Sequence, residues 1–322
     1  PFTSLGYQDV FIMKMSPDGD VLWFKQGGGV NDDSARGFAV NAAGDSVLVG
    51  ESRDEATFGT TTRTSLASEE AYVWQLHGSG TQWRVSQSQG DELTSTNAYG
   101  VALDSAGNTY VTGSHYGDVD FGSTTLTNYT TELFLCKINN AGVFEWALGV
   151  GNNYYSTGYA VVVDSAGNLR VFGSFSQTIT IAGSVVSGPV LMKVTAGGNI
   201  LWANQVATAG GSAIVGGMVL DSADSCTMTG SFDQYLQMGG DTYLPRPTYY
   251  DVFVLQVDAD GAFVWGTDGA GYAANGVDVA LDSDGEIFVT GSFNYTGNFS
   301  GTSLSNASTS GSYDAYVWHV VP

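Results

Sequence analysis

The chain has 322 residues, of which 10 are Lys or Arg and 32 are Asp or Glu, so its formal net charge is -22. A surface this negative repels phosphate backbones and anionic lipid headgroups, so we expect no nucleic-acid partner. No apolar run approaches the roughly 18 residues of a membrane-spanning helix, so we expect no membrane insertion. Aromatic residues make up 12% of the chain and 44 residues are glycine, a composition that suits short strands and tight turns and excludes a disordered chain.

One short pattern recurs along the chain at intervals of about 60 residues. Its first copy, GFAVNAAGDSVLVG, covers residues 37–50, and later copies cover residues 100–113, 160–173, 217–230 and 278–291. Most copies have two apolar runs around a turn with Asp or Asn and Gly, the pattern of a β-hairpin whose glycine has a positive φ. The sequence therefore predicts one hairpin made five times.

A second pair of strand patterns lies between successive hairpins. Its first member is present six times and begins at Asp9, Glu70, Glu132, Gly188, Asp251 and Asp314. Its second member carries a tryptophan, namely Trp23, Trp83, Trp146, Trp202 or Trp265. We interpret these tryptophans as equivalent positions of the repeated strand. A Gly-containing turn joins the two members. Each repeat therefore reads as four strands in two hairpins, which we call A, B, C and D.

Four antiparallel strands repeated at this period predict an all-β propeller made of four-stranded blades. Five blades is the simplest count. We predict a single domain over residues 1–322, with repeat units at residues 9–69, 70–131, 132–187, 188–250 and 251–313 and a partial unit at residues 314–322. Small residues that open most A strands fit a crowded centre, and length variation between B and C predicts an additional small hairpin there.

Ring closure leaves one strand over. The last repeat has A, B and C but no D, which only residues 21–25 could supply, and closing the ring with strands from both ends would remove exposed edges. The strand at residues 9–15 is then left over. We expect it to lie on an outer edge or to pair with another copy, which would build a head-to-tail filament.

The stretch DVFIMKMSPDGDVLWFKQGGGVNDDSARGFAVNAAGDSVLVGES, residues 9–52, resembles one unit of the SBBP-type β-propeller repeat family. The resemblance implies a secreted or cell-surface propeller, usually of seven blades, with no catalytic residues shared across the family. Our count of five blades departs from that number.

Four Asn-X-Ser/Thr triplets are candidate N-glycosylation sites, at Asn128, Asn294, Asn298 and Asn306. All four lie in the connection between strands B and C, and three of them lie in its last copy. This clustering predicts a secreted glycoprotein.

Two Asp-rich turns resemble the opening of a calcium-binding loop. Asp258 and Asp260 lie in one turn, and Asp282 and Asp284 lie in the other. Carboxylates at alternate positions can converge on one hard cation, but neither turn continues to the bidentate Glu of a complete loop. Because a simple hairpin turn needs Asp and Gly for backbone reasons, we predict hairpin turns here and keep weak calcium binding as an alternative. No other cofactor is predicted.

The remaining residue types form no catalytic pattern. The three histidines lack metal-ligand spacing, and the sequence has no nucleophile elbow and no Walker loop, so we predict no enzymatic activity. Cys136 and Cys226 are expected to be buried free thiols, and the strand-D tryptophans are expected to be core residues. The aromatic residues that could line a sugar-binding face are Trp74, Trp318, Tyr249, Tyr250 and those of residues 153–155.

The sequence therefore predicts a secreted, non-enzymatic propeller that serves as a structural or protein-interaction module. Its partners would be other subunits or copies of itself, in a cell-surface or filamentous assembly. The alternative is a glycan-binding or calcium-dependent adhesion domain that uses loops on one face of the ring.

Overall fold

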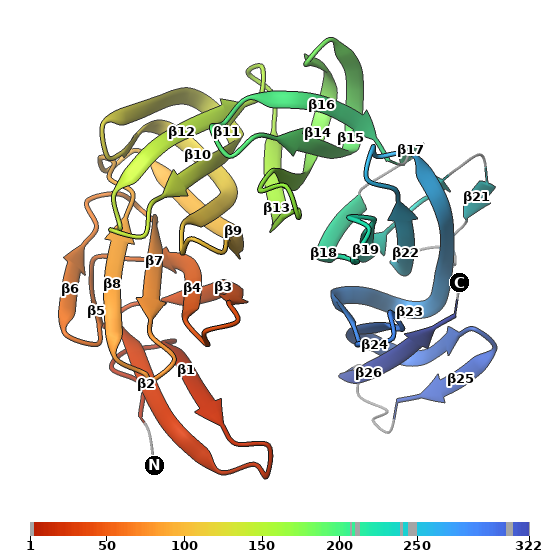
Figure 1. Ribbon diagram of the computed structural model, residues 1–322, viewed down its shortest axis with the longest axis horizontal. Helices are drawn as coiled ribbons and strands as arrows, with labels where there is room; N and C mark the ends of the chain where they lie inside the picture. Colours follow the sequence, from red (N-terminus) through yellow and green to blue (C-terminus); the bar gives the residue numbers. More distant parts are fainter. Residues whose placement is uncertain are drawn as a thin grey trace. The chain divides into compact units, whose positions relative to one another are not determined.

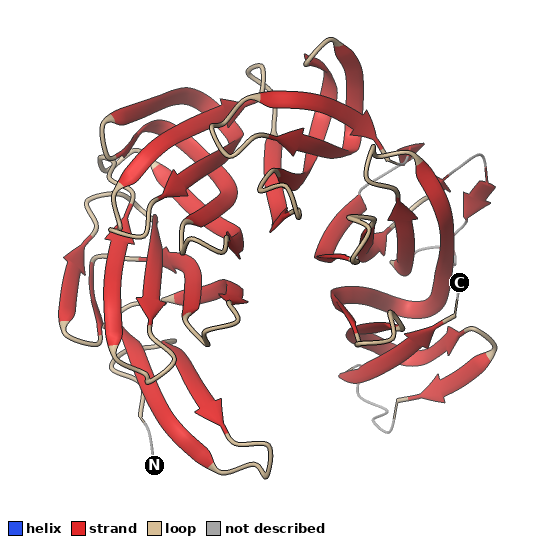
Figure 2. Ribbon diagram, viewed as in Figure 1, coloured by secondary structure: helices blue, strands red, loops and turns tan. Residues whose placement is uncertain are grey.

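The computed structural model describes residues 3–206, 208–209, 213–238, 241–243, 250–306 and 312–321. Every regular element in these ranges is a β-strand, and Figure 2 shows strands joined by loops and turns. Within the same ranges, no helix is long and apolar enough to cross a membrane. The all-β prediction is therefore confirmed.

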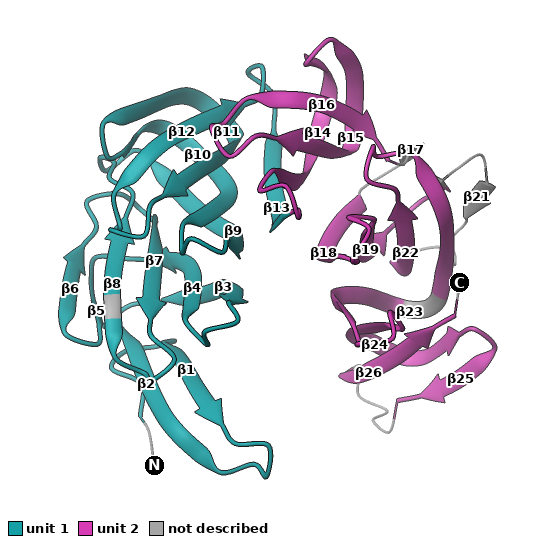
Figure 3. Ribbon diagram, in the orientation of Figure 1, with its two compact units in different colours: residues 1–163 teal, residues 164–322 magenta. Residues whose placement is uncertain are grey.

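The chain divides into two compact units, residues 1–163 and residues 164–322, which are coloured separately in Figure 3. The strands of unit 1 are β1 (Val10–Met15), β2 (Val21–Gly29), β3 (Ser34–Val40), β4 (Ser46–Ser52), β5 (Glu55–Phe58), β6 (Thr61–Thr64), β7 (Glu70–Leu76), β8 (Gln82–Gln87), β9 (Ser95–Leu103), β10 (Thr109–Phe121), β11 (Thr124–Ile138), β12 (Phe144–Val150) and β13 (Ser156–Val163). The strands of unit 2 are β14 (Leu169–Ile181), β15 (Ser184–Val194), β16 (Ile200–Gln205), β17 (Thr208–Ala209), β18 (Ala213–Leu220), β19 (Cys226–Phe232), β20 (Leu236–Met238), β21 (Asp241–Tyr243), β22 (Asp251–Val257), β23 (Phe263–Leu281), β24 (Ile287–Phe299), β25 (Thr302–Ser305) and β26 (Tyr313–Val320).

Unit 1 contains three antiparallel sheets of four strands each, in the orders β1-β2-β5-β6, β3-β4-β7-β8 and β9-β10-β11-β12 (Figure 1). The second and third sheets contain the predicted strands A, B, C and D in that order. Hairpins form here because two strands with alternating apolar residues are joined by a tight turn whose glycine has a positive φ. Gly107, between β9 and β10, is one such glycine. The prediction of two consecutive hairpins per repeat is confirmed in this unit.

Unit 2 repeats the same plan with one long strand. The first part of β23, residues 263–269, pairs with β22 as a D strand, and the second part, residues 270–281, pairs with β24 as an A strand. This continuity joins two repeats into one seven-stranded sheet, β18-β19-β22-β23-β24-β25, in which β26 also pairs with β24. Strands β17, β20 and β21 form a separate small sheet.

The additional hairpin predicted between strands B and C is present and connects repeats. It is formed by β5–β6, by the outer parts of β10 and β11, by β20–β21 and by β24–β25. Each of these hairpins pairs with the segment that leads from strand D of the preceding repeat: Gly27 with Phe58, Gln89 with Asp120, Thr208 with Gln237 and Ala270 with Asn298. Consecutive repeats within each unit are therefore joined through the backbone.

The strand left over in the count of blades, residues 9–15, is the edge strand of the first sheet. Strand β1 pairs with β2 along its whole length, from Val10 opposite Gly27 to Met15 opposite Val21. The turn between them is closed by Ser16 N donating to Asp20 O at 2.8 Å, and a short turn costs far less loop-closure entropy than a distant partner. Because β1 already lies on this edge of β2, that edge is not free to complete the last repeat as predicted.

The register of strand D also differs from the prediction at one position. Trp23, Trp146, Trp202 and Trp265 each lie opposite the residue before the end of strand C, but in the second sheet this position is held by Arg84, opposite Gln75. The four tryptophans follow their turn glycine by the same interval as Arg84 follows Gly80. The interpretation of Trp83 as the equivalent residue is therefore wrong by one position.

Consecutive C strands pack by one rule. Side chains alternate between the two faces of a strand, so in β7 Tyr72, Trp74 and Leu76 form one face, which we call the leading face, and Ala71 and Val73 form the other, the trailing face. The apolar clusters combine the trailing face of one C strand with the leading face of the next: Val10 and Ile12 with Tyr72, Trp74 and Leu76; Ala71 and Val73 with Phe134, Cys136 and Ile138; Val252 and Val254 with Tyr316, Trp318 and Val320. The repeating sheets are therefore stacked face to face, as blades are.

The small residues that open the A strands are required by close backbone contacts. A Cβ added at Gly100 would lie 2.8 Å from Ala160 Cα, and one added at Gly37 would lie 2.6 Å from Tyr99 O. Backbone atoms cannot withdraw as a flexible side chain can, so larger residues would force strands apart. The predicted crowding at this end of the A strands is confirmed in unit 1.

Candidate binding sites

The Asp-rich turns use their first carboxylate to close the turn. Asp258 Oδ1 accepts hydrogen bonds from Asp260 N at 3.0 Å and Ala262 N at 2.8 Å. Asp282 Oδ1 does the same for Asp284 N and Glu286 N, both at 2.9 Å. This is the Asx-turn geometry that makes Asp and Asn favourable in such turns.

Sibling turns without a second carboxylate form the same bonds. Asp104 Oδ1, for example, accepts from Ala106 N at 2.9 Å and Asn108 N at 2.8 Å. Asp260 and Asp284 are both exposed, and across the ranges that the structure covers no group of three or more His, Cys, Asp or Glu residues is arranged to hold a metal ion. The geometry therefore accounts for the first Asp of each turn by the backbone alone, and calcium binding stays a prediction.

The four sequons differ in exposure. Asn128 in β11 and Asn294 in β24 are each buried, at 8% and 7% exposure. Asn128 Oδ1 also accepts from Thr130 N at 3.0 Å and from Thr130 Oγ1 at 2.9 Å. Asn298 is exposed and Asn306 is half-buried. Because a glycan needs a solvent-facing amide, Asn298 is the sequon best placed to carry one.

The aromatic residues considered for a sugar-binding face fall into three groups. Trp74 and Trp318 are core residues, because both lie on the leading face of a C strand, so they are not available to a sugar. Tyr154, Tyr155 and Tyr250 are exposed. Tyr249 lies outside the described residues.

The two thiols and the histidines have structural surroundings. Cys136 and Cys226 are buried and free, as predicted, and burial raises the pKa of both thiols. His115 is buried with its Nε2 3.2 Å from Glu132 Oε2, and the exposed His319 stacks on Phe288 with ring centroids 5.0 Å apart. These contacts hold strands together and bring no nucleophile beside a base.

The leading face of β1 is exposed, in contrast to its counterparts. Phe11, Met13 and Met15 are 57%, 43% and 47% exposed, whereas Tyr72, Trp74 and Leu76 at the same positions of β7 are fully buried. Phe11 stacks on Phe24 of β2 with ring centroids 5.7 Å apart, which enlarges this apolar surface. An exposed contiguous apolar surface is typical of an interaction site.

The trailing face of β26 is exposed as well. Val317 is 71% exposed, whereas Val73, at the same position of β7, is buried. Ala315 is also exposed, whereas its counterpart Ala71 is buried. The chain therefore has, on its first and last C strands, one exposed example of each of the two faces that internal junctions bury.

A second candidate site is a concave region of unit 1, here called the acidic pocket. It has a volume of about 380 Å³ and is lined by Thr64, Leu66, Glu70, Gln89, Gly90, Asp91, Asp118 and Asp120. The lining comes from the end of β6 and the loop after it, the start of β7, the segment between β8 and β9, and the outer part of β10. Sequence reasoning missed it because these segments are separate in the sequence and the pairing of Gln89 with Asp120 brings them together.

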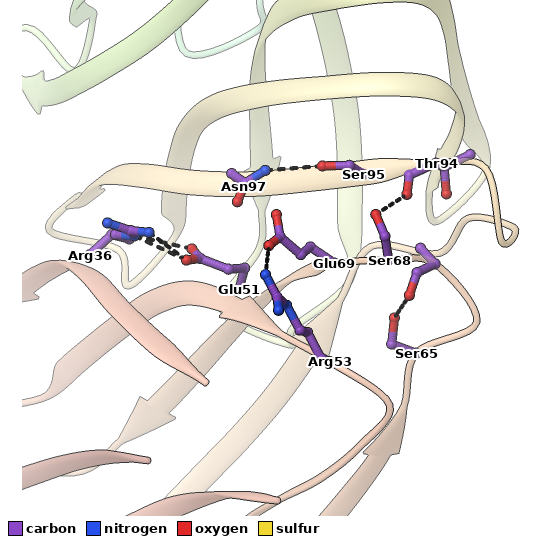
Figure 4. A network of polar contacts seen from close by, with 10 residues as sticks. Arg36, Glu51, Arg53, Ser65, Ser68, Glu69, Thr94, Ser95 and Asn97 are labelled. Atoms are coloured by element: carbon purple, nitrogen blue, oxygen red, sulfur yellow. Dashed lines mark hydrogen bonds and ion pairs between the residues drawn. The ribbon is translucent and has the colours of Figure 1, made fainter. Parts of the chain in front are cut away.

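The wall of the acidic pocket is fixed by the polar network in Figure 4. Ser65 Oγ donates to Ala67 O at 3.0 Å, and Ser68 Oγ donates to Thr94 O at 2.9 Å. Thr96 N donates to Glu69 O at 2.9 Å, and Glu69 also binds Arg53. The loop that carries the exposed Leu66 is therefore held against the segment that carries Asp91.

The carboxylates of the acidic pocket are in different environments. Glu70 is buried, accepts bonds from Gly90 N and Gln87 Nε2, and burial raises the pKa of its carboxyl. Asp118 and Asp120 are exposed on one face of β10. Asp118 also raises the pKa of the Tyr129 hydroxyl, which donates a hydrogen bond to it.

Two exposed tyrosines lie beside the carboxylate of Asp118. Tyr116 and Tyr129 lie edge to face, with ring centroids 6.4 Å apart and an interplanar angle of 88°. An aromatic face beside carboxylate acceptors can pack against the C–H face of a sugar and accept hydrogen bonds from its hydroxyl groups. The sequence indicated aromatic residues for such a surface at other positions.

Residues 86–118 match the family model described as the SBBP beta-propeller repeat. The matched stretch runs from the end of β8 through β9 into β10. The resemblance to an SBBP-type repeat found in the sequence is therefore confirmed for residues 86–118. No curated protein matches the chain.

Three solved structures resemble the chain at low identity. A protein of unknown function from Bacteroides caccae has 10% identity over 80% of this chain and 74% of its own, with a TM-score of 0.40. A glucose dehydrogenase has 10% identity over 81% and 94%, with a TM-score of 0.36. The endosialidase of phage phi92 has 9% identity over 98% of this chain, which spans only 56% of that chain, with a TM-score of 0.41. All three TM-scores are below 0.5.

Proposed function

We propose that the chain is a non-enzymatic, extracellular propeller module that assembles with copies of itself through its two end faces. These are the leading face of β1 (Phe11, Met13 and Met15) and the trailing face of β26 (Ala315 and Val317). One observation carries the proposal: the same pair of faces is buried at three internal junctions and exposed at both ends. A copy that presents β26 to β1 of the next would continue the series of stacked sheets.

The pairing of β1 with β2 supports this proposal over closure of a single five-bladed ring. Closure through strand D needs the edge of β2 that β1 occupies. Contact between end faces of different copies needs no strand exchange, only burial of apolar side chains, which stabilises by about 1.5–3 kcal/mol for each large side chain that becomes fully buried. A contact that repeats head to tail makes a filament.

The primary test is the molar mass measured by light scattering after size exclusion, at several concentrations. The wild-type chain should show mass that rises with concentration. Met13→Glu and Val317→Glu should each give a monomer, because either places a charge in the new junction. Val185→Glu is the matched control, because Val185 is 70% exposed in β15 and lies on neither end face.

A cross-linking test separates contact between copies from contact within one chain. Met13→Cys and Val317→Cys are made in separate chains and mixed under mild oxidation; the buried Cys136 and Cys226 stay unreactive. Disulfide-linked pairs of unlike chains support assembly. A cross-link that forms only when both substitutions are in one chain, at monomer mass, would show intramolecular closure and overturn the proposal.

The second candidate function, glycan binding, is favoured by the acidic pocket and the exposed pair Tyr116 and Tyr129. It is tested on a glycan array with and without a chelator, using the wild-type chain, Tyr129→Ala and Asp118→Asn. Binding that both variants lose, and that chelator leaves intact, supports recognition of a neutral glycan by these residues. Binding that chelator abolishes supports a calcium-dependent adhesion domain instead, and no binding in either condition removes this candidate.

A further inference from the structure

A second concavity of unit 1 has the opposite electrostatic character from the acidic pocket. This arginine pocket has a volume of about 360 Å³ and is lined by Arg63 of β6, residues 84–87 of β8, Gly142 and Phe144. It lies where the D strand of one repeat meets the C–D turn of the next. Two guanidinium groups in one small concavity are unusual in a chain with only 10 basic residues against 32 acidic ones.

Arg84 replaces a tryptophan in the repeating plan of the fold. At the same register position the other C–D pairs have Trp23, Trp146, Trp202 and Trp265. Trp23 lies against the turn glycine of the next repeat, Gly80, and Trp202 lies against Gly261; Arg84 lies against Gly142 in the same way. An indole ring fills its junction with apolar atoms, whereas an arginine brings hydrogen-bond donors to it.

The Arg84 side chain depends on the absence of a side chain at Gly142. A Cβ added at Gly142 would overlap Arg84 Cδ, and Gly142 has a φ of +74°. Ser86 Oγ donates to Gly142 O at 3.1 Å, which fixes the turn against β8. The position of the guanidinium is therefore set by the backbone of the neighbouring repeat.

Neither guanidinium has a carboxylate partner among the described residues. Arg36, Arg53 and Arg170 each form an ion pair, but Arg84 has no hydrogen bond or ion pair with any residue that the structure describes. Arg63 donates one bond from Nη2 to Val85 O, and its buried Nε has no acceptor within the described part of the chain. Donors left without acceptors in a concave site are available to a ligand.

We propose that the arginine pocket binds the carboxylate of an acidic sugar residue. The planar guanidinium presents paired donors that match a carboxylate in bidentate fashion, which makes arginine the side chain best suited to this group. The volume is that of a small-ligand site, and the half-buried Phe144 lies in its lining, where its ring can pack against the C–H groups of a pyranose ring. This site is separate from the end faces, so it stands or falls independently of self-assembly.

The experiment is calorimetric titration of the wild-type chain with glucuronate, glucose, glutamate and inorganic phosphate. Glucuronate should bind, and glucose, which has the ring without the carboxylate, should bind at least about tenfold more weakly, as expected for loss of a charge-assisted hydrogen bond. Glutamate and phosphate, which have an anion without the ring, should also bind more weakly. Equal binding of glutamate or phosphate would overturn the assignment to a sugar.

Variants locate the binding. Arg84→Trp places in this sheet the residue that the other four have at this position, so the chain should stay folded, with an unchanged melting temperature, and lose glucuronate binding. Arg63→Gln should weaken binding about tenfold or more, whereas Lys25→Gln, which removes the same charge elsewhere, should not.

Gly142→Ala should weaken binding by displacing Arg84, and Gly19→Ala, at a turn glycine with φ +90° and open space, should not. Wild-type affinity in Arg84→Trp, or no glucuronate binding by the wild-type chain, would overturn the proposal.

Discussion

Strands β1 and β7 are made from nearly the same pattern, yet one has an exposed leading face and the other a fully buried one. VFIMKM in β1 and EAYVWQL in β7 both alternate apolar side chains between two faces, and both form a hairpin with a following D strand. In β7 the leading face packs against the trailing face of β1, whereas the leading face of β1 has no such neighbour among the residues of its own unit. The comparison teaches that the repeat pattern determines the sheet, and the neighbouring repeat determines which face becomes core.

The largest expected effect is at the buried leading face. Trp74→Ala should lower the free energy of unfolding by about 3–5 kcal/mol, because it removes a fully buried indole and leaves a cavity. Met13→Ala, at the same position of β1, should cost less than about 1 kcal/mol, because Met13 is already 43% exposed. Urea denaturation measures both. Equal losses at the two positions would mean that the leading face of β1 is covered as well as that of β7.

A glycine in a sheet and the glycine in the turn after β1 should separate the effect of close contact from that of backbone conformation. Gly113 lies in β10, where an added Cβ would overlap Asn97 O and lie 2.8 Å from Phe134 Cε1. Gly113→Ala should cost about 3 kcal/mol, because a carbonyl oxygen in a sheet cannot withdraw. Gly19→Ala, in the turn after β1, meets no atom within 4 Å and has only its φ of +90° to oppose it, so about 1 kcal/mol is expected. Thermal melting compares them, and a larger loss at Gly19 would contradict the contact geometry.

The segments between strands D and A differ in how they hold a carboxylate, which gives a pH-dependent test. Asp33, between β2 and β3, is buried with its Oδ2 2.7 Å from Gly29 N, and burial raises the pKa of its carboxyl to about 6. Asp91, between β8 and β9, is exposed and accepts from Leu93 N at 2.9 Å. Because the pKa of Asp33 is raised in the folded state, its protonation stabilises the fold below the unfolded pKa of 3.8, and this contribution is lost as pH rises through about 6.

The measurement is the free energy of unfolding of the wild-type chain and of Asp33→Asn at several pH values from 4 to 7. The wild-type chain should lose stability relative to Asp33→Asn as pH rises through that window and then stay level. Asp18→Asn, in the exposed turn after β1, is the control. A difference between wild type and Asp33→Asn that is constant with pH would exclude the raised pKa.

The sequence was sufficient to predict the strands, hairpins and small residues of the fold, because each depends on local alternation or on a turn. The B–C hairpins were also predictable, since length variation marks connections. The register of Arg84 was misread because repeats were aligned on tryptophan; counting from the turn glycine, Gly80, would have placed Arg84 at the position of Trp23 and revealed the exception. The signal was present in the sequence, because the β-bulge at the end of strand C is the same in all five C–D pairs and the interval from the turn glycine is therefore constant.

The acidic pocket could not have been predicted in the same way. Glu70 lies in β7, Asp91 between β8 and β9, and Asp118 in β10, and the pairing of Gln89 with Asp120 brings these segments together. The exposure of the end faces is likewise a property of the neighbours that a strand has, which no pattern within that strand contains. Sites that are formed by contacts between repeats therefore cannot be predicted from the pattern within one strand.

The smallest expected effect distinguishes two ion pairs in the network of Figure 4. Arg36 donates from Nε and Nη2 to Glu51 at 3.1 and 2.7 Å, and Glu51 is buried, whereas Arg53 and Glu69 are both more open to solvent. A double-mutant cycle on Arg53 and Glu69 should give a coupling of about 0.2–1 kcal/mol that 1 M salt removes. The Arg36–Glu51 cycle should keep most of its coupling in salt, because removing Arg36 leaves a buried carboxylate without its partner. Equal salt dependence of the two cycles would show that Glu51 is as well solvated as Glu69, and that the network contributes little to fixing the wall of the acidic pocket.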